Sequence, residues 1–242
     1  MNGYEGLEAA VLRIVGHRLS AKQLDSFAWY NRELISWNQR FNLTAITDPV
    51  EIEIKHFLDS LSCLKVDQFR PPGKVIDVGT GAGFPGIPIK LLYPQFNITL
   101  VESVGKKASF CQHVIDTLEI EEIQVLHDRA ETLGRNVAHR ESYDWGLARA
   151  VAIAPVLLEY LIPLIRVGGR AILQKGETGL AEMHQAEHAL RVLGAEVEQI
   201  QAVELPRVTE PRHLATVRKV AATPPKYPRR PGMAAKRPLI SA

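Results

Sequence analysis

The chain has 242 residues, enough for one domain of ordinary size, of which 46% are hydrophobic and 23% are charged. Its most apolar stretch, residues 150–165, is interrupted by two prolines and a glutamate and is too short to span a bilayer, which takes about 20 apolar residues. No basic segment followed by an apolar run marks a signal peptide at the start. We therefore expect a globular, cytoplasmic protein without a membrane partner.

The net charge of +2 hides an asymmetry along the chain. Residues 207–242 hold nine Lys or Arg and one acidic residue, whereas the preceding part holds 20 basic and 26 acidic residues. Such a basic end predicts either a polyanionic partner or a solvated tail. The two cysteines, Cys63 and Cys111, lack zinc-like spacing, so we expect reduced thiols and no metal site.

Residues 4–70 carry apolar side chains at helical spacing, for example Phe27, Tyr30, Leu34 and Trp37. Thr47-Asp48-Pro49 is typical of a helix start. No stretch alternates as a strand would. The sequence thus predicts a helical N-terminal cap over residues 1–70, with Trp37 in its core.

After Pro71-Pro72-Gly73, short apolar runs alternate with helix-like segments, which predicts a parallel sheet with helices on both faces. The expected strands are residues 75–78, 98–101, 123–126, 145–148 and 171–174, and the expected helices lie near 86–93, 105–118, 153–166 and 178–193. Runs at 197–203 and 214–220 have no long helix between them and should pair antiparallel at one edge. We assign residues 71–222 to this sheet domain and residues 223–242 to a basic, proline-rich tail.

The stretch Val75–Gly86 (VIDVGTGAGFPG) predicts a buried strand followed by a glycine-rich turn and a helix. Gly79, Gly81 and Gly83 allow a tight turn and let a ligand approach the backbone. Flavin, nicotinamide and S-adenosylmethionine enzymes all use such a turn, and a plain strand-to-helix turn is a further alternative.

Two features favour S-adenosylmethionine. Phe84 and Pro85 crowd the helix start where a dinucleotide would place its pyrophosphate. Glu102 follows the next strand, 23 residues after Gly79, where a carboxylate can accept hydrogen bonds from both ribose hydroxyls. The alternative for Glu102 is a solvated loop carboxylate.

The ends of the next two strands should border the same crevice, because ligands lie across the carboxyl ends of parallel strands. Ala130 and Glu131 follow the third strand and are placed to border the adenine. Arg149 ends the fourth strand, near the methyl donor, where it can contact a phosphate or a guanine edge. A surface salt bridge is the alternative for Arg149.

Several stretches resemble one known family, the bacterial glucose-inhibited division protein B family of 16S rRNA guanine-N7 methyltransferases. The resemblance runs from about residue 37 to residue 239. The matching stretches are residues 37–49 (WNQRFNLTAITDP), 55–61 (KHFLDSL), 76–88 (IDVGTGAGFPGIP), 101–103 (VES), 106–107 (KK), 129–131 (RAE), 148–150 (ARA), 175–176 (KG), 212–214 (RHL) and 225–232 (PKYPRRPG). Cofactor binding demands neither NLTAI nor HFLDS, so these two are more specific than the glycine-rich turn.

The resemblance implies an α/β class I (Rossmann-like) methyltransferase sheet, mostly parallel with an antiparallel edge, and a helical N-terminal cap. It implies S-adenosyl-L-methionine as cofactor and 16S ribosomal RNA or the small ribosomal subunit as partner. The implied cofactor-binding residues are Gly79, Phe84, Glu102, Ser103, Val104, Ala130, Glu131 and Arg149. Some members have Asp at the position of Glu102, which keeps the ribose contact.

Guanine N7 carries a free lone pair and no proton, so in-line placement suffices for methyl transfer. The chain lacks the Asn/Asp-Pro-Pro-Tyr motif that exocyclic amines need, and neither cysteine follows a strand as a covalent route would require. We therefore expect direct transfer without a covalent intermediate and without a dedicated general base. We name no catalytic residue.

The RNA footprint is expected on the basic tail with Tyr227 and on Asn42, Lys55, His56 and Lys175. For His56 a structural role tying the cap to the sheet is an equal alternative. A nicotinamide-dependent oxidoreductase and a non-catalytic ribosome assembly factor remain as competing functions.

Overall fold

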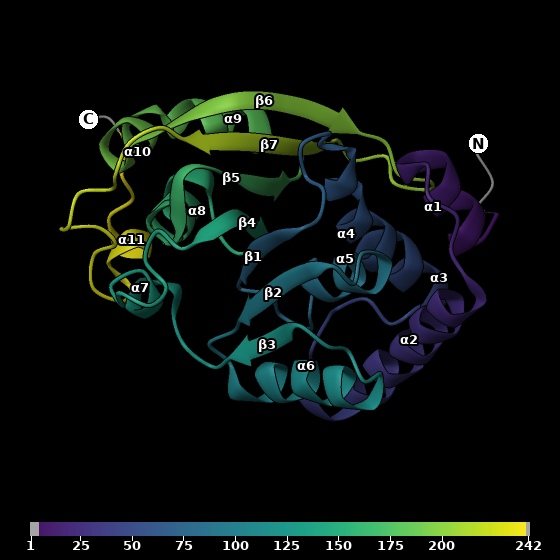
Figure 1. Cartoon of the computed structure of the whole chain (residues 1–242). Helices are drawn as coiled ribbons and strands as arrows, with labels where there is room; N and C mark the ends of the chain where they lie inside the picture. Colours follow the sequence, from purple (N-terminus) through teal and green to yellow (C-terminus); the bar gives the residue numbers. More distant parts are fainter. Residues whose placement is uncertain (1–4, 241–242) are drawn as a thin grey trace.

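The structure is a computed structural model and describes residues 5–240. Its centre is a seven-stranded sheet in the order β3-β2-β1-β4-β5-β7-β6, in which β7 alone runs opposite to the other six strands (Figure 1). The strands are β1 (Gly73–Val78), β2 (Phe96–Val101), β3 (Ile123–Leu126), β4 (Tyr143–Arg149), β5 (Ile165–Lys175), β6 (Ala195–Val203) and β7 (Arg212–Lys219). The predicted class I sheet with an antiparallel edge is confirmed.

Helices cover both faces of the sheet. Successive strand residues point to opposite faces, so apolar strands need cover on both sides. Val75 belongs to one hydrophobic core and Ile76 to the other. The first core lies under α5 (Gly86–Leu92), α6 (Gly105–Thr117) and the N-terminal helices. The second lies under α8 (Ala154–Leu161), α9 (Gly179–Gln185) and α10 (Glu187–Leu193), and the short α7 (Ala130–Leu133) follows β3.

Two predicted helices have the wrong extent. The helix expected over 153–166 ends at Leu161, and a 3-10 turn (Ile162–Leu164) follows, because Pro163 has no N–H for a helical hydrogen bond. Strand β5 then starts six residues earlier than the apolar run at 171 indicated. The helix expected over 178–193 is two helices that meet at Ala186.

The N-terminal cap consists of α1 (Leu7–Val15), α2 (Ala21–Phe41) and one irregular helical run from Pro49 to Lys65. Ser20 and Gln23 form a capping box at the start of α2, and the Asp48 side chain caps the irregular run. That run comprises α3 (Pro49–Ile52), a π-helical turn (Glu53–Leu58), α4 (Asp59–Leu61) and a 3-10 turn (Ser62–Lys65). The cap contributes to the first hydrophobic core, so it is packed on the sheet.

After β7 the chain crosses back beside α7 and α8 and includes the short α11 (Met233–Lys236) (Figure 1). Within residues 5–240, no helix combines the length and apolar character needed to cross a membrane. Over the same residues, no group of three His, Cys, Asp or Glu side chains has the arrangement of a metal site.

Candidate functional site

Hydrogen bonds to the Asp77 side chain hold the glycine-rich loop that follows β1. This buried carboxylate accepts hydrogen bonds from the Thr80 hydroxyl at 2.6 Å and from the Gly86 backbone N–H at 2.8 Å. Burial raises the pKa of Asp77 to about 6, although both hydrogen bonds act in the opposite direction. The carboxyl group therefore holds the two ends of the loop together.

The N-terminal cap fixes the middle of the same loop. The Tyr30 hydroxyl of α2 donates to the backbone carbonyl of Ala82. Gly83 has φ +96°, and a Cβ there would lie 2.5 Å from the Tyr30 hydroxyl oxygen. Gly81 has φ +62°, but nothing lies within 4 Å of the position of its Cβ. The loop is thus closed toward Tyr30 and open above Gly81, where a ligand can approach the backbone.

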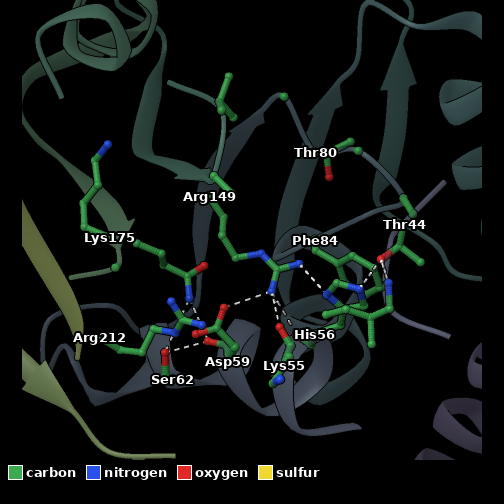
Figure 2. Close-up of a pocket in the computed structure, with 18 of the residues that line it drawn as sticks. Thr44, Lys55, His56, Asp59, Ser62, Thr80, Phe84, Arg149, Lys175 and Arg212 are labelled. Carbon is green, nitrogen blue, oxygen red and sulfur yellow. Dashed lines mark hydrogen bonds and ion pairs between the residues drawn. The ribbon is translucent and has the colours of Figure 1, made fainter. Parts of the chain in front are cut away.

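Phe84 connects the loop to the π-helical turn of the cap. Its ring stacks on His56 at a centroid distance of 4.6 Å and on Tyr30 at 5.5 Å. The Thr44 hydroxyl lies 2.8 Å from His56 Nε2 (Figure 2). Burial, together with the nearby Arg149 guanidinium, lowers the pKa of His56 to about 3. His56 is therefore a neutral structural contact between cap and loop at neutral pH.

Arg149 ends β4 and reaches into the cap. Leu147 faces the first core and Ala148 the second, so alternation directs Arg149 toward the cap. Its guanidinium donates to Lys55 O and to Asp59 Oδ2, both at 2.9 Å, and lies over the Phe84 ring (Figure 2). The salt bridge expected as an alternative exists, but it is largely buried rather than on the surface.

These elements surround a cavity of about 570 Å³ at the carboxyl ends of β1, β4 and β5. Its wall combines the glycine-rich loop, the cap and the β5–β7 edge of the sheet. The polar and charged side chains that line it are Thr44, Lys55, His56, Asp59, Ser62, Thr80, Lys107, Arg149, Gln174, Lys175, Glu182, Arg212 and His213. Three of the eight predicted cofactor residues also line it, namely Gly79, Phe84 and Arg149.

The predicted residues after β2 lie beside the glycine-rich loop, outside this lining. The Glu102 carboxylate is 6% exposed and accepts hydrogen bonds from the N–H groups of Gly81 and Val104, both at 2.8 Å. Ser103 and Val104 are exposed. Glu102 is thus ordered against the backbone of the loop rather than solvated, contrary to the alternative.

The predicted residues after β3 point elsewhere. Ala130 is buried, and the Glu131 carboxylate accepts a hydrogen bond from the Gly232 N–H of the tail at 2.8 Å. Neither residue lines the cavity.

Among the residues expected to contact RNA, Lys175 points inward. It is 8% exposed and donates to Ala152 O and to Glu182 Oε2, both at 2.6 Å. Lys55 pairs with Glu51 on its own helix, while Asn42 is exposed.

Sequence reasoning did not assign Asp59, Asp77 or Tyr30 to the site. One signal was available for Asp77, because this ionisable residue stands among the buried apolar residues Val75, Ile76 and Val78 of β1. The pairing of Asp59 with Arg149 and of Tyr30 with Ala82 depends on tertiary packing, which left no local pattern.

Comparison with known proteins agrees with the observed fold. Similar solved structures include TrmN from Thermus thermophilus (TM-score 0.53, 20% identity, 67% of this chain and 48% of that one) and a 16S rRNA (adenine(1408)-N(1))-methyltransferase from Catenulisporales acidiphilia (TM-score 0.52, 13% identity, 63% and 87%). At these identities the likeness shows the fold alone.

Curated relatives are much closer in sequence. The Ribosomal RNA small subunit methyltransferase G of Roseiflexus castenholzii is 48% identical over 225 residues, covering 93% of this chain and 95% of the relative. The protein of the same name from Bacillus cereus (strain B4264) is 41% identical over 230 residues, covering 95% and 96%. These matches support neither an oxidoreductase nor a non-catalytic assembly factor. A family model described as rRNA small subunit methyltransferase G (GidB) matches residues 23–214, and the chain therefore belongs to this family, as its sequence resemblance predicted.

Proposed function

We propose that this protein transfers the methyl group of S-adenosylmethionine to N7 of a guanine in 16S ribosomal RNA. The observation that carries the proposal is the family match over residues 23–214, which includes every wall of the cavity. An rRNA substrate goes with a cytoplasmic location, which is part of the same proposal.

The residues at the glycine-rich loop fit the cofactor. Open space above Gly81 leaves the backbone accessible at the carboxyl end of β1. The Glu102 carboxylate lies at the end of the neighbouring strand, hydrogen-bonded to Gly81 N–H, where two ribose hydroxyls can replace or share its backbone donors. We assign Gly79, Phe84 and Glu102 through Val104 to the cofactor, with Ala130 bordering the adenine and Arg149 the methyl-donor end. The Glu131 carboxylate is bonded to the Gly232 N–H of the tail, so we do not assign it a direct cofactor contact.

S-adenosylmethionine, when bound, supplies an electrophilic methyl group on a positively charged sulfur. That methyl group would be available to the N7 lone pair of a guanine held in line with it. No proton leaves N7, so the protein needs to place the base in line rather than to deprotonate it. His56, being neutral and engaged with Thr44, is not required as a base.

The positive charge that develops on the purine is best stabilised by a carboxylate. Asp59 lines the cavity and is 9% exposed, with one carboxylate oxygen bonded to Arg149. We assign Arg149 a positioning role, because its donors already hold Asp59 and the cap carbonyl of Lys55. Arg212 and Lys107 add positive charge to the cavity wall, which suits a nucleotide phosphate.

Incubation with tritiated cofactor tests the proposal. The substrates are 16S RNA, small subunits and assembly particles from cells that lack this protein, and labelled nucleosides are identified by mass. We expect 7-methylguanosine at one position. Cofactor binding without label uptake by any of the three substrates would overturn the proposed reaction, and label on another base or atom would overturn the N7 assignment.

The ribose contact has its own test. Glu102→Ala should weaken cofactor binding, measured by calorimetry, by about 1–3 kcal/mol because charge-assisted hydrogen bonds are lost. Glu119→Ala, at the exposed turn that follows the opposite end of α6, is a control. Equal affinity of Glu102→Ala and the wild type would remove Glu102 from the site.

A further inference from the structure

The basic C-terminal tail is docked on the protein rather than free. Its described part, residues 223–240, crosses α7 and α8 (Figure 1) and buries Tyr227 and Leu239. Arg140 bridges the end of α7 and the tail, since its Nη1 donates to Gly134 O and Tyr227 O, both at 2.8 Å. The tail backbone is therefore ordered by a side chain of the sheet domain.

The most basic part of the tail is anchored by a buried carboxylate. Glu159 of α8 is 0% exposed. Arg229 donates to Glu159 Oε1 from its backbone N–H and from Nε, both at 2.8 Å, and to Oε2 from Nη2 at 2.5 Å. A charge committed to a buried partner is not available to a polyanion. The neighbouring Arg230, in contrast, is exposed.

The same tail holds α7. Gly232 N–H donates to Glu131 Oε1 at 2.8 Å, and Arg135 Nε donates to Pro228 O at 2.8 Å. Gly134 packs so closely on the tail that a Cβ there would lie 2.8 Å from Pro228 Cγ. Contacts with the tail thus run from the first turn of α7 to its end.

We propose that the tail clamps α7 in place and that Glu131 is a positioning residue, which serves the adenosine site through its bond to Gly232 rather than by touching the cofactor. This inference rests on the proposed function, because that function places the adenine beside Ala130 at the start of α7. It explains why the Glu131 carboxylate faces the tail and why Tyr227 and Pro228 of the PKYPRRPG stretch (residues 225–232) are buried although the stretch is positively charged.

Two substitutions of Glu131 test the role of its carboxylate by calorimetry with S-adenosylmethionine or S-adenosylhomocysteine. Glu131→Gln keeps the acceptor oxygen for Gly232 and should bind within about twofold of the wild type. Glu131→Ala removes the acceptor and should bind about tenfold more weakly, the equivalent of one hydrogen bond. If Glu131→Gln is as weak as Glu131→Ala, the carboxylate contacts the cofactor directly and the inference is wrong. Wild-type affinity of Glu131→Ala also overturns it.

A second pair of variants tests the clamp. Arg229→Gln should weaken cofactor binding about tenfold and speed hydrogen exchange in α7, as expected for a lost buried contact. Arg230→Gln removes the same charge from an exposed position and should do neither. Equal effects of the two variants on cofactor binding would overturn the clamp. An effect of both variants on RNA affinity alone would also overturn it and would identify the tail as an RNA-binding arm. If Arg229→Gln does not fold, Arg229→Gln/Glu159→Gln removes both charges and is measured instead. The cofactor titrations contain no RNA, so their outcome does not depend on whether the methylation proposal holds.

Discussion

The low pKa of His56 makes a quantitative prediction about stability. The pKa is about 3 in the folded protein, against an ordinary value of 6.5, because burial and Arg149 both disfavour the imidazolium. Between these two values the unfolded chain binds a proton that the folded protein does not. Stability is therefore fully present above pH 6.5 and is lost as the pH falls toward 3.

The size of the effect follows from the shift. Lowering the pH from 8 to 5 should cost about 2 kcal/mol at this one residue, since each unit of pH below 6.5 costs about 1.4 kcal/mol. Asp77 acts in the opposite direction over the same range. Its pKa is raised by burial to about 6, so the folded protein binds the extra proton and gains about 1 kcal/mol at pH 5. The wild-type curve alone therefore cannot isolate His56.

Comparison with His56→Gln isolates it, because Asp77 and all other groups remain. The assay is urea denaturation at several pH values between 8 and 5, followed by tryptophan fluorescence. At pH 8 the variant should be less stable than the wild type, because it loses the stack on Phe84. This deficit should shrink by about 2 kcal/mol by pH 5. A deficit that stays constant over the range would refute the assignment of His56 as a buried neutral contact.

Two further substitutions test the contacts between the cap and the sheet. Tyr30→Phe leaves the Ala82 carbonyl without its donor, so it should lower the free energy of unfolding by about 1–3 kcal/mol and weaken cofactor binding. Chemical denaturation measures the first effect and calorimetry the second. If neither value changes, the role of Tyr30 is contradicted. In Arg149→Lys the single ammonium group cannot reach Lys55 O and Asp59 together, so the melting temperature and the methylation rate of the variant should both fall. If the variant keeps both values, the shape of the guanidinium group is not needed.

The sheet was largely predictable because most of its strands appear in the sequence as apolar runs, which in the central strands follow from burial on both faces. The bounds of β3 agree with the predicted run at 123–126. The prediction of β5 was shorter than the strand because its first half is a glycine-containing, mostly exposed stretch (residues 165–170) without such a run. In β5, hydrophobicity alone thus found the buried half of the strand and missed the more exposed half.

The candidate site was predictable only where residues follow a strand directly. Gly79 and Arg149, which line the cavity, could be placed there from strand order, and Glu102 could be placed beside the glycine-rich loop. The direction of a side chain that contacts a distant segment could not be predicted from strand order, and Glu131 shows why. Its partner Gly232 lies 101 residues further along the chain, in a stretch whose composition indicated a loop. Only the packed structure decides whether such a carboxylate meets a ligand or another part of the chain.

Three of the contacts made by the N-terminal cap couple it to the glycine-rich loop and to the end of β4, which has consequences for how RNA would act on the site. Tyr30 bonds to Ala82 O, His56 stacks on Phe84, and Arg149 bonds to Lys55 O. Each such contact contributes on the order of 1 kcal/mol. A displacement of the cap by bound RNA would have to break all three, whereas RNA that fits the cap as it stands breaks none. Binding of RNA and binding of cofactor should therefore support each other through the cap, since both require the same arrangement.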